Sequence, residues 1–392
     1  MPRSRLATGG PWLLAAALAV TAVGAFGMGF WNAWVRNQDA DMQLRVAEYA
    51  AFRVGDYPNP SVDRPQAGRK VPFTAYPPYA LPMFTPFFEP GGLLQGRLLV
   101  EVLTIAAVVL MGSYGNARLK PFGSGWAVVG SLAGVSMATN GMTLSLGQFS
   151  TVSAGLTVLQ LILLERRAAI PAGLCWAGGM IKPQIALPFA ALFLVNRQAR
   201  GLACGIVVLA ALSAIAVWWT DLSPGALANH WLFRMRMDFA KESGGVGIGH
   251  VAAWLGWNPR VMQFLALGAL VVVAVAAAAG VRFVHRDVVV PDLLPLAGIC
   301  AVLGRVLVYH RHYDNVMLFP LLLAWLCRAL AAPTAANAAT AAAVGLTLWI
   351  PQRVQDDVPF VEFLVPAIWI VAALRLARVA LTEPLTRSGG EA

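Results

Sequence analysis

Apolar runs long enough to cross a lipid bilayer recur along the whole chain, and they restrict its fold more than any other feature. A span must cross a hydrocarbon core roughly 30 Å thick. The twelve candidate runs, several of them short, are residues 11–34, 96–112, 124–143, 149–164, 168–181, 184–195, 202–219, 260–281, 291–308, 314–330, 338–350 and 360–378. We therefore predict an all-α, polytopic transmembrane helical bundle of about 11–13 spans, in which residues 1–392 form a single integral membrane domain.

Composition supports this class and excludes others. Hydrophobic residues make up 58% of the chain and charged residues 12%, with a mean hydropathy of +0.66, whereas soluble domains are roughly one-quarter charged. The formal charge of +10 comes from short Lys and Arg clusters between apolar runs, so it indicates membrane topology rather than nucleic-acid binding. The four cysteines lie singly in apolar segments without CxxC spacing, and they predict no disulfide framework.

The basic clusters also predict the orientation of the chain. On one side of the membrane they place Arg3/Arg5, Arg118/Lys120, Arg166/Arg167, Arg197/Arg200, Arg282/Arg286 and Arg375/Arg378/Arg387. Because basic loops resist translocation, we expect a multi-pass protein of the cell membrane with that side, both termini and a short tail at 380–392 in the cytoplasm. The first run is too long for a signal peptide and is expected to remain as an anchor.

Residues 168–195 allow two layouts. They could form one tilted helix kinked at Pro183, or two short helices that meet near Lys182 and Pro183. A single helix would move Arg197 and Arg200 to the outer side, whereas a hairpin keeps the basic residues on one side and holds Lys182 at its outer end. We favour the hairpin.

The long polar loops 35–95 and 220–259 then face the periplasm or the exterior and could cover a site. Residues 42–53 of the first loop can form a short amphipathic helix. Asp39 and Asp41 stand at its start, where carboxylates suit general-base or metal chemistry, although an ordinary polar helix end would look the same. Tyr76 precedes a diproline in this loop, a pattern that a proline-rich turn also explains.

Three further polar residues lie at junctions between the predicted elements. Gln148 follows a glycine between two spans, and its amide suits hydroxyl groups, although a simple turn would give the same sequence. Lys182 is a stronger signal, because a lysine between apolar half-helices needs a partner: a phosphate, or a loop carboxylate in an ion pair. Arg234, near Trp231 in loop 220–259, suits a phosphate beside a sugar ring unless it only neutralises Asp238.

The segment 309–314, YHRHYD, is a dense polar group between two apolar spans. If the segment is helical, His310 and Asp314 share a face while His312 points elsewhere, so the two histidines would not chelate one metal without a bend. Arg311 with one histidine fits an anionic head group better.

Taken in order, these clusters resemble glycosyltransferase family 87, the polyprenyl-phosphate-sugar-dependent enzymes of the GT-C superfamily. The matching segments are "DADMQLRVAEYAAFRVGDYP", "AYPPYALPMF", "LSLGQFSTV", "AGLCWAGGMIKPQIALPF" and "YHRHYDNVMLFP". The resemblance implies a GT-C-like fold and the inverting transfer of a sugar, often mannose or arabinose, from a polyprenyl-phosphate donor to a lipid or glycan acceptor on the outer face of the membrane.

The resemblance also implies roles for single residues. It makes Asp41 the catalytic base, with Asp39 as the second choice, whereas Leu44 and Arg45 stand where the family often has a tyrosine and leave the acceptor open. The donor phosphate is expected at Lys182, His310, Arg311 and Arg234. The sugar or the acceptor is expected at Tyr76, Gln148, Gln184, His312 and Asp314. We expect no metal and no cofactor besides the lipid-linked co-substrate.

Two other classes compete with the enzyme. A transporter or flippase of lipid-linked sugars would need similar cationic and hydroxyl-binding groups, but such proteins are often built from repeated halves, and only one broken helix pair occurs here. A structural membrane protein without catalysis would not need the Asp and Lys placements. We favour the enzyme.

Overall fold

The structure is a computed structural model, and it describes most of the chain. The described residues are 9–37, 40–58, 76–240, 255–258, 261–262, 265–266, 268–269, 272, 276, 279–280, 292–307, 311–350 and 358–382. Within these residues every regular element is a helix, which confirms the predicted all-α class.

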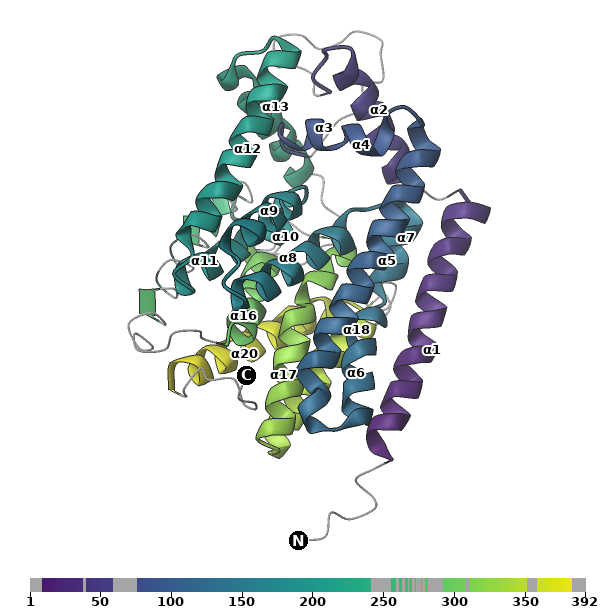
Figure 1. Ribbon diagram of the computed structural model, residues 1–392, viewed down its shortest axis with the longest axis vertical. Helices are drawn as coiled ribbons and strands as arrows, with labels where there is room; N and C mark the ends of the chain where they lie inside the picture. The colour runs from purple at the N-terminus through teal and green to yellow at the C-terminus, as the bar shows by residue number, and fades with distance from the viewer. Residues whose placement is uncertain are drawn as a thin grey trace.

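Figure 1 shows the helices in chain order by colour. The first half of the chain contains α1 (Gly10–Phe30), the π-helical turn η2 (Trp31–Val35), α2 (Ala40–Arg53), α3 (Ala80–Met83), α4 (Thr85–Phe88), α5 (Gly92–Leu119), η3 (Lys120–Phe122), α6 (Ser124–Val135), α7 (Thr139–Leu146), α8 (Ser150–Glu165) and α9 (Ala169–Gly179). The second half contains α10 (Pro183–Ala186), η4 (Leu187–Ala190), α11 (Ala191–Val195), α12 (Ala199–Thr220), α13 (Pro224–Ala240), α16 (Leu294–Leu307), η5 (His312–Leu318), α17 (Phe319–Ala331), α18 (Ala335–Trp349) and α20 (Pro359–Thr382).

Several of these stretches can cross a membrane. In the described part of the chain, six are long and apolar enough: Gly10–Val35, Gly92–Phe122, Ser124–Leu146, Ala199–Thr220, His312–Ala331 and Phe363–Thr382. Four shorter apolar helices accompany them: Ser150–Glu165, Pro183–Val195, Leu294–Leu307 and Ala335–Trp349. The chain is therefore a polytopic membrane protein. The predicted span 260–281 lies largely outside the described residues.

Helix α1 lies along one flank of the bundle, against α6 and α7 (Figure 1). The approach is close because glycines line it: a Cβ at Gly141 would lie 2.3 Å from the Ala25 carbonyl oxygen, and a Cβ at Gly29 would lie 2.7 Å from the Gly141 carbonyl oxygen. Small residues of this kind let helix backbones pack directly in membranes. This packing fixes α7 to α1 at the level of the polar residues described below.

The predicted span 124–143 is two helices, α6 and α7, because a buried asparagine terminates the first. Asn140 donates from Nδ2 to the carbonyl oxygens of Gly134 (2.8 Å) and Val135 (3.0 Å). Its own carbonyl oxygen accepts a hydrogen bond from Thr151 Oγ1 (3.1 Å). An interrupted helix is tolerated within a bilayer only when its freed backbone groups find such partners.

The predicted hairpin over residues 168–195 is confirmed. Asn196, just after α11, donates from Nδ2 to the carbonyl oxygen of Leu164 (2.6 Å), in the last turn of α8, the helix before α9. Arg167 donates from Nη1 to the Asn196 carbonyl oxygen (2.9 Å). Both ends of the segment therefore lie together, and Lys182 occupies the opposite end of the hairpin.

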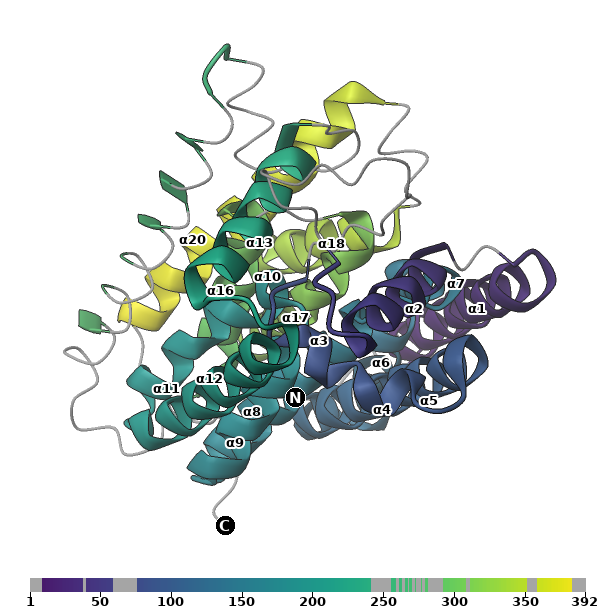
Figure 2. The same ribbon diagram turned by 90° about the horizontal axis from the view of Figure 1, so that it is seen from above.

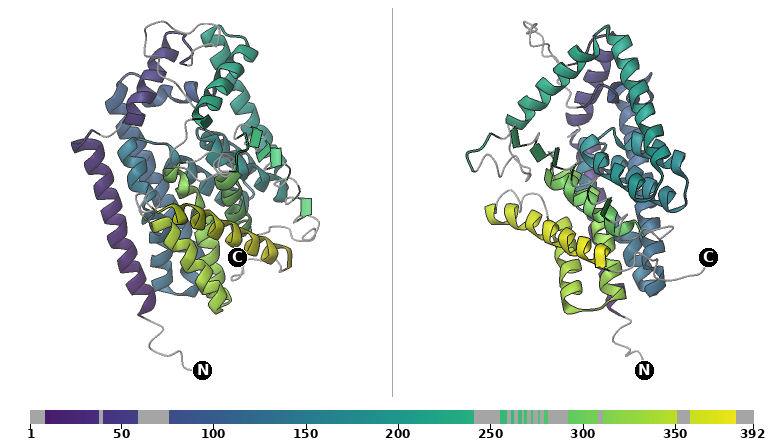
Figure 3. Two further views of the ribbon diagram at one scale, coloured as in Figure 1. Left: turned by 180° about the vertical axis from the view of Figure 1, so that it is seen from behind. Right: turned by 90° about the vertical axis from the view of Figure 1, so that its left-hand side faces the viewer.

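Short helices cover the end of the bundle that carries Lys182. Figure 1 shows α2, α3, α4 and α13 gathered there, and Figure 3 shows the same cap from two further sides. The predicted amphipathic helix at 42–53 is confirmed as α2, which buries the face that carries Met42, Arg45, Glu48, Tyr49 and Phe52. That face packs on aromatic side chains of the cap, and Trp219 of α12 donates from Nε1 to the Phe52 carbonyl oxygen (2.6 Å).

Candidate active site

Asp41 stands in the first turn of α2, one of the helices of the cap. A carboxylate at a helix N-terminus is stabilised by the helix dipole. Gln148 donates from Nε2 to Asp41 Oδ2 (2.5 Å) and comes from the turn that ends α7. Gly147 adopts the left-handed conformation in this turn (φ 68°), and a Cβ there would lie 2.7 Å from Met42 Cβ. The glycine therefore allows Gln148 to meet Asp41, as a side chain at that position would not.

Three distant segments converge on a buried ion pair next to this contact. Lys182, which precedes α10, donates from Nζ to Asp314 Oδ1 of η5 (3.1 Å) and to Ser150 Oγ at the start of α8 (2.8 Å). Ser150 in turn donates to Asp314 Oδ1 (2.7 Å). The side chains of Lys182 and Asp314 are 4% and 2% exposed. Of the two partners predicted for Lys182, the structure shows the loop carboxylate.

Residues 311–314 wrap around this pair. The Lys182 ammonium lies 4.5 Å from the centroid of the Tyr313 ring. The Arg311 backbone N–H donates to Asp314 Oδ2 (3.2 Å), and its side chain is exposed. The segment is a 3-10 helix that begins at His312, so the α-helical spacing that put His310 and Asp314 on one face does not describe it.

The two clusters are neighbours, because Gln148 belongs to one and Ser150 to the other. The Asp41 carboxylate interacts electrostatically with Lys182 and with Tyr313. Phe149, between Gln148 and Ser150, anchors the loop that serves both clusters, because its ring stacks on Phe84 of the cap with centroids 5.6 Å apart. The same turn therefore places the Gln148 amide against Asp41 and the Ser150 hydroxyl against Asp314.

A second buried ion pair lies on α2, one turn beyond Asp41. Arg45 Nη1 is 2.7 Å from Glu48 Oε2, and the Arg45 guanidinium lies 4.5 Å from the centroid of the Tyr76 ring. Tyr76 also meets the edge of Phe84, with centroids 5.2 Å apart. Burial raises the pKa of the Tyr76 phenol above its ordinary value of 10, so the hydroxyl stays neutral. Arg45 therefore lies between the candidate base and Tyr76 and packs against the tyrosine ring.

Arg305 of α16 is a further charged residue, and sequence reasoning missed it. It is 1% exposed and donates from Nε to Asn315 Oδ1 (2.6 Å), beside Asp314. The signal was present, because an arginine inside an apolar span is a functional candidate by default. Ser150 was also missed, since a single serine at a helix start carries no distinctive signal.

The described side chains of this region carry an excess of positive charge. They bring four cationic groups together with three anionic ones: Lys182, Arg45, Arg305 and Arg311 with Asp41, Glu48 and Asp314. Arg311 is exposed, but Lys182 and Arg305 are buried close to a single buried carboxylate, Asp314. Buried charges are costly unless they are balanced. The arrangement therefore suits an anionic ligand better than a neutral or cationic one.

The structure places most of the predicted site residues in this region. Asp41, Gln148, Lys182 and Asp314 come together, and Tyr76, Arg311 and His312 adjoin them. Gln184 is half-buried in α10, close to Gly304 of α16. Arg234 lies on α13, but its side chain is outside the described residues, as are Asp39 and His310. Among the described residues no three His, Cys, Asp or Glu side chains could hold a metal ion together, and the expectation that none is needed stays a prediction.

A family model described as glycosyltransferase family 87 matches residues 73–309, more than half of the chain. The match contains Tyr76, Gln148 and Lys182, while Asp41 and Asp314 lie outside it, so their assignment depends on the geometry. No curated protein and no solved structure matches the chain. The sequence clusters, the polytopic helical fold and this match together show that the chain belongs to glycosyltransferase family 87 and is a membrane glycosyltransferase.

Proposed function

We propose that the protein transfers a sugar from a polyprenyl-phosphate donor to a lipid or glycan acceptor on the outer face of the membrane, with inversion of the anomeric centre. The observation that carries the proposal is the pairing of the Asp41 carboxylate with a buried, net cationic cluster around Lys182 and Arg305. A base for the hydroxyl and cationic groups for the phosphate are what displacement of a phosphate by a hydroxyl requires.

In this mechanism Asp41 accepts the proton of the acceptor hydroxyl. The hydroxyl oxygen attacks the anomeric carbon from the face opposite the phosphate, and the bond between that carbon and the phosphate oxygen breaks. The electron pair leaves with the polyprenyl phosphate. Gln148 orients the base, because its amide N–H holds one carboxylate oxygen and leaves the other for the acceptor.

Charge that develops on the departing phosphate needs cationic partners. Arg311 is exposed at the start of η5 and offers a guanidinium that can donate two parallel hydrogen bonds to a phosphate. We assign Lys182 a supporting role, because two of its three N–H groups go to Ser150 and Asp314. It neutralises Asp314, so that the phosphate does not meet an uncompensated carboxylate.

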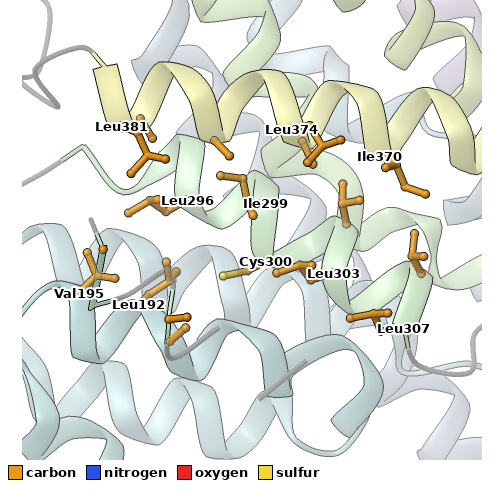
Figure 4. A pocket seen from close by; sticks show the side chains of 18 residues that line it. Leu192, Val195, Leu296, Ile299, Cys300, Leu303, Leu307, Ile370, Leu374 and Leu381 are labelled. Atoms are coloured by element: carbon orange, nitrogen blue, oxygen red, sulfur yellow. The ribbon is translucent and has the colours of Figure 1, made fainter. Parts of the chain in front are cut away.

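An apolar groove suits the hydrocarbon chain of such a donor. A cavity of about 500 Å³ lies between α11, α16 and α20, and Ala276 and Gly280 also line it. Figure 4 shows it lined by carbon atoms, with the sulfur of Cys300 as the exception. It extends along α16 from Leu296 to Leu307, roughly 16 Å at 1.5 Å per residue. Leu307, at the end of this groove on α16, stands four residues before Arg311 in the chain. Mannose and arabinose are the sugars we propose to test first.

The test uses purified protein in lipid vesicles with a membrane glycolipid extract. Radiolabelled polyprenyl-phosphate mannose, polyprenyl-phosphate arabinose and the matching nucleotide sugars are offered separately. We expect label to reach a new lipid or glycan from a polyprenyl-phosphate donor and not from a nucleotide sugar. Transfer from a nucleotide sugar alone, or movement of the intact donor across the vesicle without transfer, would refute the proposal.

A further inference from the structure

Two polar groups beside the candidate base are buried without a partner. Arg45 is 6% exposed and Gln148 is 7% exposed. In the part of the chain that the structure describes, Arg45 Nε and Gln148 Oε1 make no hydrogen bond. The contact with Asp41 fixes which end of the Gln148 amide is the nitrogen, because a carboxylate accepts from Nε2 and leaves Oε1 unused. Buried donors and acceptors are costly to leave unpaired, so these groups mark a place that a ligand or a water completes.

Both groups adjoin Asp41. Arg45 follows Asp41 by one turn of α2, and residues at this spacing are neighbours, with Cβ atoms about 5–6 Å apart. Helix α2 contacts both α3 and α7, and Figure 2 shows the three helices together when the molecule is seen from above. The Arg45 guanidinium packs on the Tyr76 ring, and that ring meets the edge of Phe149, with centroids 6.4 Å apart. Phe149 precedes Ser150 and follows Gln148, so a continuous series of contacts runs from Arg45 to Gln148 and back to Asp41.

The charge of Arg45 is already balanced. Glu48 is fully buried, and its Oε2 lies 2.7 Å from Arg45 Nη1. This ion pair and the Tyr76 ring hold the guanidinium in place, so its Nε–H is oriented before any ligand arrives. Because the Arg45–Glu48 pair has no net charge, the Nε–H suits a neutral oxygen better than a second anion.

A sugar hydroxyl matches these two groups. It can accept a hydrogen bond from Arg45 Nε–H and donate one to Gln148 Oε1, either as one hydroxyl or as two on neighbouring ring carbons. A phosphate or carboxylate would also accept from Arg45 but would face the lone pairs of Gln148 Oε1. A deoxygenated carbon would leave both groups unpaired, and sites that hydrogen-bond a substrate hydroxyl strongly reject the analogue that lacks it.

We infer that Arg45 and Gln148 bind a hydroxyl of the acceptor sugar next to the hydroxyl that Asp41 deprotonates, and that Arg45 is a specificity-determining residue. This inference rests on the proposed function and deepens it. It restricts the acceptor to sugars with a free hydroxyl beside the one that attacks, whatever molecule carries the sugar.

A matched pair of double variants separates this role from a role in stability. Arg45→Met alone would leave Glu48 as an uncompensated buried charge. The test variant is therefore Arg45→Met/Glu48→Gln, which removes both charges with little change in volume. The control is Arg53→Met/Glu89→Gln, which removes an exposed ion pair at the end of the same helix (3.5 Å). Thermal unfolding in detergent checks that both variants are folded.

The first experiment measures how methyl glycosides inhibit transfer to a membrane glycolipid extract. The probes are the methyl mannoside, glucoside, galactoside and arabinoside, followed by the monodeoxy analogues of the best inhibitor. With wild type and the control, we expect one deoxygenation to weaken inhibition by about tenfold or more, because it leaves Arg45 and Gln148 unpaired. In the residual transfer of Arg45→Met/Glu48→Gln, the parent glycoside and that analogue should differ by less than about twofold. A wild type that responds equally to every analogue, or a test variant that keeps the wild-type preference, would overturn the inference.

The second experiment needs no donor and no turnover, so it separates this inference from the proposed function. Saturation-transfer NMR records binding of the same glycosides to each protein in nanodiscs. We expect the same preference among the analogues in wild type and in the control, and no preference in Arg45→Met/Glu48→Gln. This preference without any transfer would support the hydroxyl site and refute the proposed function, whereas transfer without the preference would refute the hydroxyl site alone.

Discussion

The Lys182 ammonium lies 3.1 Å from the Asp314 carboxylate, although 132 positions separate the two residues in the chain. Both side chains are almost fully buried. The ion pair joins the end of the α9–α11 hairpin to the start of η5 and thereby fixes the position of Arg311. The ion pair contributes to the stability of the fold and also to the charge distribution at the site. Mutation can separate these two contributions.

Replacing one partner of this pair should destabilise the protein strongly. Lys182→Met leaves Asp314 as an uncompensated buried charge, for which a loss of about 3–5 kcal/mol is expected. The double variant Lys182→Met/Asp314→Leu removes both charges and should recover most of the lost stability without recovering transfer. Thermal unfolding in detergent measures the first effect and donor-dependent transfer the second. Full stability in the single variant would show that the pair is not a buried structural contact.

Gln148 should act on the rate rather than on substrate binding. In Gln148→Leu the Asp41 carboxylate loses its amide partner, and kcat should fall by about tenfold to a hundredfold with little change in the donor KM, because orientation of the base is lost. Gln43→Leu, on the exposed face of α2, is the control and should leave both constants unchanged. A raised donor KM at constant kcat would instead place Gln148 at the donor.

Arg311 should govern affinity for the donor phosphate. Arg311→Ala should raise the donor KM by about tenfold or more, and Arg311→Lys should recover only part of it, because a lysine cannot donate the paired hydrogen bonds of a guanidinium. Arg53→Ala is a suitable control, since that side chain is 65% exposed at the end of α2. Steady-state kinetics at varied donor concentration provide the measurement, and an unaltered donor KM in Arg311→Ala would exclude the assigned role.

The groove along α16 should make transfer depend on the length of the donor's polyprenyl chain. Ala377 lines this groove on α20, whereas Val371 of the same helix is exposed and does not line it. Ala377→Phe should reduce transfer from a long-chain polyprenyl donor by about tenfold and affect a short-chain donor much less, because only the long chain buries its apolar surface there. Val371→Phe should affect neither donor. The same loss with both chain lengths would indicate general damage to the fold.

Local sequence patterns predicted the parts of the fold that depend on neighbouring residues. Apolar runs predicted the membrane helices, polar spacing predicted α2, and the distribution of basic residues predicted the hairpin that ends at Lys182. The break between α6 and α7 was not predicted, because it depends on Asn140 reaching carbonyl groups five and six residues before it. The 3-10 turn at His312 was missed for a similar reason.

Contacts between distant segments could not be read from the sequence. Asp314 was expected to bind the sugar or the acceptor, and its contact with Ser150 bridges 164 positions of the chain. Arg305 and Asn315 lie ten positions apart but on different helices, and no periodicity relates them. Such pairings depend on how the helices pack. A single sequence therefore identifies candidate polar residues, and the structure shows which of them are in contact.

The role of Asp41 as the base is tested by comparing transfer of radiolabelled sugar from a polyprenyl-phosphate donor by wild type, Asp41→Asn and Asp56→Asn. Asparagine keeps the volume of the side chain and cannot accept the proton, so Asp41→Asn should lose about 10²–10⁴-fold in rate while its thermal stability stays near that of wild type. Asp56 is exposed beyond the end of α2, and Asp56→Asn should match wild type. Transfer by Asp41→Asn at the wild-type rate would show that Asp41 is not the base.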